Sequence, residues 1–254
     1  MRIVVKNKFA KINYYIVMES TYIAFCQKLF EDWRSSNLKV DRSCEQLFQL
    51  EYVPEPYLNF KASQNPLYIL NINPGSGMDD LQLRDKLIED KYDDVANRFG
   101  DFYLSNDFKK AGAAYRRNIR ALQIAEDNGF NGFVNLETIP FHSNTLNKLR
   151  ALEVVKSEPI LIEYTALLKD FISDKCVVVV AACSSRDSIT KKTVSDNSWL
   201  NFQRDCIGLN LETSKLTPLV IKNNKVTSAI ISDRNKHILL MMGSNNFPAT
   251  TIKL

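Results

Sequence analysis

Apolar and polar positions along the chain follow two alternating spacings. Apolar residues recur at helical intervals over Thr21–Ser36, and helices are also predicted over Asp107–Asn128 and Glu158–Ile172. Short apolar runs predict buried strands at Leu67–Ile72 and Cys176–Ala182. The second of these runs is apolar throughout and β-branched, which is typical of a strand covered on both faces.

Weaker patterns fill the intervals between these elements. The remaining predicted elements are a short helix at Ser43–Leu50, a helix-compatible charged stretch at residues 79–96, and strands at Phe133–Asn135, Val226–Ile231 and His237–Met242. Prolines punctuate Val53–Phe60, so an extended loop is expected there. Gly129 follows the predicted helix Asp107–Asn128 as a terminator.

Alternation of helix and strand predicts an α/β fold with a parallel sheet and helices on both of its faces. A length of 254 residues fits one such domain over residues 1–254, with residues 1–20 as a peripheral extension. In a parallel sheet, ligands bind beyond the carboxyl ends of the strands. The loops after Ile72, Val134, Ala182 and Met242 therefore become candidates for a site.

Composition narrows the class of protein. The net charge of +4 permits nucleic-acid binding without demonstrating it. No apolar run reaches the roughly 20 residues of a membrane span, and lysines interrupt the N-terminal segment, so a cytoplasmic protein is expected. The five cysteines form no C-x-x-C pair and only two histidines occur, so we expect buried free thiols and no metal site.

Two segments carry candidate chemistry. Asn73-Pro74-Gly75-Ser76-Gly77 follows a strand but lacks the lysine of a phosphate-binding P-loop and the third glycine of a dinucleotide-binding loop. It is either a plain turn or a cradle for an anion or a water. The segment 135–143 combines an amide, an aromatic ring, an imidazole and a hydroxyl, as functional loops and capped turns both do. Arginines at 116, 117 and 120 form a solvated face or a phosphate contact.

Three segments together resemble the uracil-DNA glycosylase superfamily. LYILNINPGSG (residues 67–77) resembles its first motif in the G-[IM]-N-P-G form, and FVNLETIPFHS (133–143) resembles the strand that ends in a base-reading asparagine. HILLMMGSNNFPA (237–249) stands where the last motif, a strand and a serine-containing loop, is expected. Asn71 replaces the usual glycine of the first motif, and Gly243-Ser244-Asn245 replaces H-P-S in the last. The only nearby histidine, His237, lies inside the predicted strand.

This resemblance implies a three-layer α/β/α sandwich with a central, mostly parallel four-stranded sheet. It also implies a cofactor-free hydrolysis of the N-glycosidic bond of a base flipped out of DNA. By the resemblance, Asn73 is the catalytic residue that holds the attacking water. It also implies two further sets of contacts. The base would be bound by Ile72, Asn135, Phe141 and Phe102, and the DNA by Gly75, Ser76, His142, Ser143, Ser244, Asn245 and Asn246.

The first hypothesis is therefore a monomeric, monofunctional DNA glycosylase of base-excision repair type, acting on an aberrant or modified base. Uracil and a bulky cytosine derivative are both candidate targets. The alternative is a non-catalytic nucleic-acid-binding protein that retains the fold. A third hypothesis, a thiol hydrolase, would use Cys183 at the end of its strand as the nucleophile.

Overall fold

The structure is a computed structural model that carries no ligand. It describes residues 21–75, 77, 80–87, 91–182, 184–186, 193–195, 198–208, 217–222, 225–232 and 237–242. Five candidate site residues, Ser76, Cys183, Ser244, Asn245 and Asn246, lie outside this part of the chain, as do residues 1–20.

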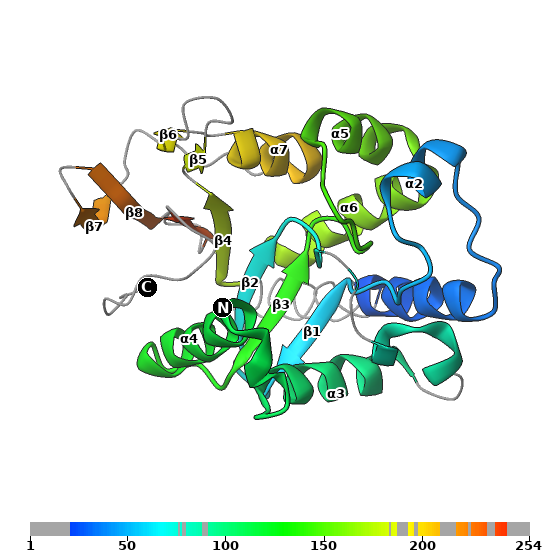
Figure 1. The fold of residues 1–254 in the computed structure, drawn as a ribbon, viewed down its shortest axis with the longest axis horizontal. Coiled ribbons are helices and arrows are strands. Elements are labelled where there is room, and N and C mark those ends of the chain that lie inside the picture. Colours follow the sequence, from blue (N-terminus) through cyan, green and yellow to red (C-terminus); the bar gives the residue numbers. More distant parts are fainter. Residues whose placement is uncertain are drawn as a thin grey trace, which may run out of the picture.

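Four parallel strands form the centre of the sheet, in the order β3-β2-β4-β9 (Figure 1). Their bounds are Leu67–Asn71 for β2, Phe133–Glu137 for β3, Val177–Ala182 for β4 and His237–Met242 for β9. This arrangement confirms the predicted α/β fold with parallel central strands. It also brings the carboxyl ends of all four strands to one edge of the sheet.

Antiparallel strands extend this centre on both sides. Strand β1 (Tyr57–Phe60) pairs with β3, and β8 (Lys225–Ser232) joins β9 to β7 (Thr217–Lys222). Within the described residues the sheet therefore has seven strands, and the four at its centre are parallel. A separate pair, β5 (Ser184–Arg186) and β6 (Thr193–Ser195), follows β4.

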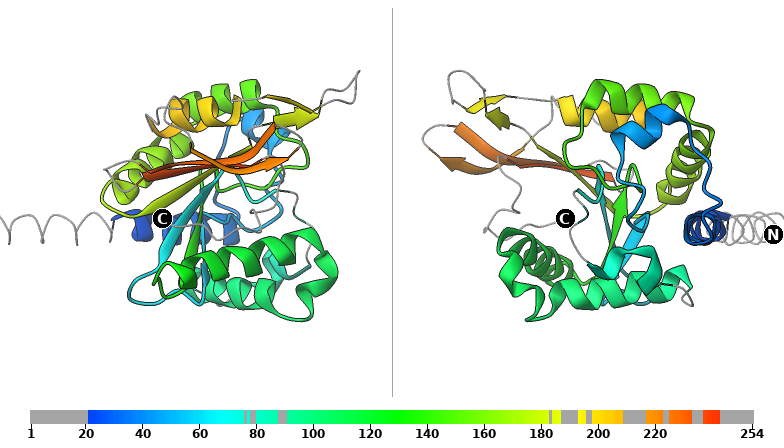
Figure 2. Two further views of the ribbon diagram at one scale, coloured as in Figure 1. Left: turned by 90° about the vertical axis from the view of Figure 1, so that its left-hand side faces the viewer. Right: turned by 45° about the vertical axis from the view of Figure 1, so that its right-hand side comes forward.

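Helices cover both faces of the sheet. Figure 2 shows α3 (Tyr92–Leu104) and α4 (Ala113–Asp127) on one side, and α5 (Lys148–Ser157), α6 (Pro159–Ile172) and α7 (Ser198–Ile207) on the other. Two more helices, α2 (Arg42–Leu47) and a helix over residues 21–34, complete the described part. The three-layer arrangement matches the prediction.

Several local predictions are corrected. The proline-punctuated stretch ends in strand β1, because Tyr57–Phe60 finds a partner in β3 that the local sequence does not reveal. The stretch 79–96 is not one helix: it has 3-10 turns at Asp80–Gln82 and Arg84–Lys86, and α3 begins only at Tyr92. A 3-10 turn (Phe108–Ala111) likewise precedes α4. Helices α5 and α7 were not predicted.

Two apolar clusters form the core. The larger one lies around the sheet and includes Tyr22, Phe30 and Trp33 from the N-terminal helix, while the smaller one includes Phe48 and Phe141. Cys26 and Cys44 are fully buried free thiols, as expected. Burial raises the pKa of the Cys44 and Cys206 thiols to about 12, so both remain protonated and unreactive at neutral pH.

Among the residues that the structure describes, no helix is both long and apolar enough to span a bilayer.

Candidate functional site

The loops after β2 and β3 meet beyond the carboxyl edge of the sheet. Pairing of Asn71 with Glu137 brings the two strand ends into register. The pairing continues into the loops, where the backbone N–H of Ser143 donates to the carbonyl of Gly75 at 2.7 Å. The structure thus places three predicted site residues, Asn73, Gly75 and Ser143, side by side.

Asn73 is oriented by this loop contact. Its Nδ2 donates to the Ser143 hydroxyl oxygen at 2.9 Å, so its Oδ1 acceptor points away from Ser143. Gly75 turns the chain here with φ of +85°, a left-handed conformation that glycine adopts at little cost. A Cβ atom added at Gly75 would meet no atom within 4 Å, so space beside this turn is open.

A directed chain of hydrogen bonds runs across the face of the sheet that α4 covers. Arg117 of α4 donates through Nη2 to Asn71 Oδ1, and Asn71 Nδ2 donates to Asn135 Oδ1. Asn135 Nδ2 then donates to Glu137 Oε1 at 2.7 Å. Both polar atoms of Asn135 therefore already have partners inside the protein, and the predicted base-reading asparagine is a link in this chain.

Glu137 ends the chain in a buried environment. It is 5% exposed, and its second oxygen, Oε2, has no hydrogen-bond partner. Burial raises the pKa of Glu137 to about 8, with a smaller upward contribution from the charge of Glu55. The hydrogen bond from Asn135 and the charge of Arg117 lower the pKa but do not offset burial.

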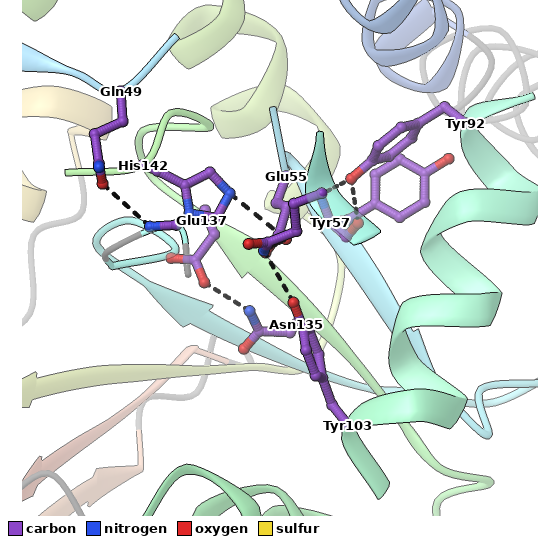
Figure 3. A network of polar contacts seen from close by, with 10 residues as sticks. Gln49, Glu55, Tyr57, Tyr92, Tyr103, Asn135, Glu137 and His142 are labelled. Carbon is purple, nitrogen blue, oxygen red and sulfur yellow. Dashed lines mark hydrogen bonds and ion pairs between the residues drawn. The ribbon is translucent and has the colours of Figure 1, made fainter. Parts of the chain in front are cut away.

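A second buried acid, Glu55, lies beside His142 (Figure 3). The separation between His142 Nε2 and Glu55 Oε1 is 3.6 Å, and neither ring nitrogen of His142 has a hydrogen-bond partner although His142 is 1% exposed. Gln82 donates through Nε2 to Glu55 Oε1 at 2.7 Å and to the Tyr103 hydroxyl at 3.0 Å. Glu55, Gln82 and His142 therefore form a buried polar group that links three separate segments.

Backbone contacts hold this group in place. The N–H of Glu55 donates to the carbonyl of Pro140 at 2.7 Å, and the N–H of Gln49 donates to the carbonyl of His142 at 2.9 Å. The side chain of Gln49 accepts from the N–H of Gly77 at 3.1 Å, so Gln49 tethers both site loops. We define the polar edge as Glu55, Asn71, Asn73, Gln82, Arg117, Asn135, Glu137, His142 and Ser143.

The aromatic residues predicted to stack on a base lie elsewhere. Phe141 is 2% exposed and packs against Phe48 with ring centroids 5.8 Å apart, so it contributes to the smaller apolar cluster. Phe102 is half-buried in α3 against Tyr103 and Phe108. Ile72 is half-buried and packs against the smaller apolar cluster.

Sequence reasoning did not single out Glu55, Gln82 or Glu137. Glu137 carried a signal, because a glutamate two residues after Asn135 shares its face of a predicted strand. Gln82 carried none, since only the tertiary fold brings its segment to Glu55 and His142. Within the described part of the chain, no group of His, Cys, Asp and Glu side chains has the arrangement of a metal site.

Comparison of the chain with models of protein families, with curated proteins and with solved structures gives no match.

Proposed function

We propose that this protein is a DNA glycosylase that hydrolyses the N-glycosidic bond of an aberrant or modified base. The observation that carries the proposal is the meeting of Asn73 with Ser143 beyond the carboxyl edge of four parallel strands, next to a buried set of acids and amides. Ligands bind at this edge of open α/β sheets. Asn73 and Ser143 come from the two segments that resemble the first two motifs of the uracil-DNA glycosylase superfamily.

The chemistry needs a positioned water and a stabilised leaving base. A flipped nucleotide leaves the stack and presents its C1′–N bond to the protein. Asn73 Oδ1, turned away from Ser143, accepts a hydrogen bond from the attacking water and orients it toward C1′. As the bond breaks, its electron pair stays on the base, the water oxygen binds C1′, and the proton that the water loses passes to the departing base anion. A neutral amide orients water without taking its proton, so a slow reaction that depends on the leaving base is expected.

Binding to DNA would rely on backbone phosphates. The net charge of +4 favours polyanions, and helix α4 presents Arg116 to solvent. We further propose that the protein is monomeric, acts in the cytoplasm and needs no cofactor.

The test is an abasic-site assay on oligonucleotides that contain uracil, hypoxanthine, xanthine, mismatches, or hydroxymethylated or glucosylated cytosine. We expect one substrate to yield alkali-labile strands. Asn73→Ala should lower the rate of excision at least about 100-fold, the effect of removing a positioned amide from an active site, with little change in DNA affinity. Asn106→Ala, which replaces an exposed asparagine after α3, is the matched control and should retain the wild-type rate.

Other outcomes decide between the alternatives. DNA binding without cleavage of any substrate would favour the non-catalytic binding protein. Excision by Asn73→Ala at the wild-type rate would contradict the proposed role of Asn73. Loss of activity in Cys183→Ser would instead support the thiol hydrolase.

A further inference from the structure

Buried polar atoms without partners concentrate at the polar edge. Within the described residues, four side chains carry such atoms: Arg84, Glu137, His142 and Gln203. Glu137 and His142 belong to the polar edge, and Gln203 Nε2 lies 3.4 Å from the carbonyl oxygen of Asn71. Buried polar groups are nearly always hydrogen-bonded, so this clustering indicates groups that a ligand would satisfy.

The hydrogen-bond chain fixes which oxygen of Glu137 can carry a proton. A guanidinium can only donate, so Arg117 requires Asn71 to accept at Oδ1 and to donate at Nδ2. Asn135 therefore accepts from Asn71 at Oδ1 and donates through Nδ2 to Glu137 Oε1. With Oε1 committed as an acceptor, any proton on the carboxyl group resides on Oε2, the atom without a partner.

We propose that Glu137 Oε2 donates a hydrogen bond to the flipped base and stabilises the negative charge that develops on it. This inference rests on the proposed glycosylase function and assigns the group that recognises the leaving base. Stabilising this charge needs a hydrogen-bond donor that is directed at the base. A neutral carboxyl group is suited to it, because a donor aimed at developing charge in a buried site is strongly stabilising.

The surroundings of Glu137 keep the carboxyl group protonated near neutral pH. The burial and the charge of Glu55 that raise its pKa act in this direction, and Arg117 opposes them. The titratable groups around it come from every neighbouring element: Arg117 from α4, Glu55 from the segment before β1, His142 from the loop after β3, Tyr103 from α3 through Gln82, and Tyr164 from α6, whose hydroxyl donates to the backbone carbonyl of Glu137. A donor of this kind is lost when pH rises above the pKa of about 8.

The experiment compares duplexes that are identical except for one nucleotide. In the test duplexes, the variable nucleotide carries uracil, hypoxanthine or cytosine on a 2′-fluoroarabino sugar that resists hydrolysis. An abasic analogue stands opposite it in the other strand. In the reference duplex, the variable nucleotide is itself an abasic analogue, so neither strand has a base at this position. Fluorescence anisotropy at pH 6.5 and pH 9.5 gives the factor by which a base increases affinity, which removes the phosphate contribution common to all duplexes.

We expect wild-type protein to bind at least one base about tenfold more tightly than the reference at pH 6.5 and to lose this gain at pH 9.5. Glu137→Gln keeps a donor that does not titrate, so it should retain the gain at both pH values. Glu137→Leu should lack it at both. A purely structural role of Glu137 would not produce this pattern across pH.

The proposal is overturned if wild type shows no base-dependent gain, if the gain is equal at the two pH values, or if folded Glu137→Leu retains it. The wild-type comparison needs no variant, and Glu137→Gln conserves shape, so misfolding of the leucine variant does not decide the result. Excision is measured in parallel on the natural sugar. If abasic sites form but the base-dependent gain in affinity does not change with pH, the proposed role of Glu137 is wrong and the glycosylase function stands. If the gain in affinity changes with pH as expected but no abasic sites form, the role of Glu137 in binding a base stands and the glycosylase function is wrong.

Discussion

The wild-type protein is expected to lose stability as pH rises from about 5 to about 8, and the Glu137→Gln variant is expected not to show this loss. The pKa of Glu137 is about 8 in the folded protein, against an ordinary value of 4.5. Between these values the folded state binds more protons than the unfolded state, so the free energy of unfolding decreases with increasing pH. Each tenfold change in a proton dissociation constant corresponds to about 1.4 kcal/mol, which gives an upper bound of about 5 kcal/mol.

Urea unfolding at pH 5, 6, 7 and 8 measures this effect. Subtracting the values for Glu137→Gln from those for wild type cancels the other titrating groups and isolates Glu137. The free energy of unfolding of wild type minus that of Glu137→Gln should decrease by several kcal/mol between pH 5 and pH 8. Glu163→Gln, on the exposed face of α6, is the matched control and should run parallel to wild type. A constant difference for Glu137→Gln would show that the carboxyl group is ionised throughout.

Gly100→Ala is expected to destabilise the protein by about 3 kcal/mol, although alanine is the better helix former. Helix propensity alone predicts a gain of about 1 kcal/mol at an interior position such as this one in α3. The structure reverses the sign, because a Cβ atom at Gly100 would lie 1.7 Å from the carbonyl oxygen of Asn59 in β1. Backbone packs on backbone there, so α3 would have to move away from the sheet.

Thermal and urea unfolding of Gly100→Ala test this packing. Asp101→Ala, one residue along α3 and exposed, is the control and should change stability by no more than about 0.5 kcal/mol. Since α3 also holds Tyr103 against Gln82, Gly100→Ala should weaken base-dependent DNA binding as well. A stability equal to or above that of wild type would contradict the close approach of α3 to β1.

The polar edge shows which features of the site can be predicted from local sequence and which cannot. The turn after β2 and the loop after β3 are recognisable from their residues, and parallel strands bring them together. The prediction for Asn135 was incomplete, because its neighbours in space, Asn71 and Glu137, engage both of its polar atoms. Phe141 shows the same limit of local sequence: an aromatic ring in a polar loop can face a ligand or the core, and here it packs against Phe48.

Sequence by itself determined the fold class and the order of the central strands along the chain, because apolar spacing depends on which face of each element is buried. It also determined that Asn73 and Ser143 follow strands that share one edge. Only the tertiary structure decided that β1 joins the sheet and that Glu55, Gln82 and His142 form one buried group. These features depend on contacts between segments far apart in the chain, and the burial that sets the pKa of Glu137 exists only once those segments have packed.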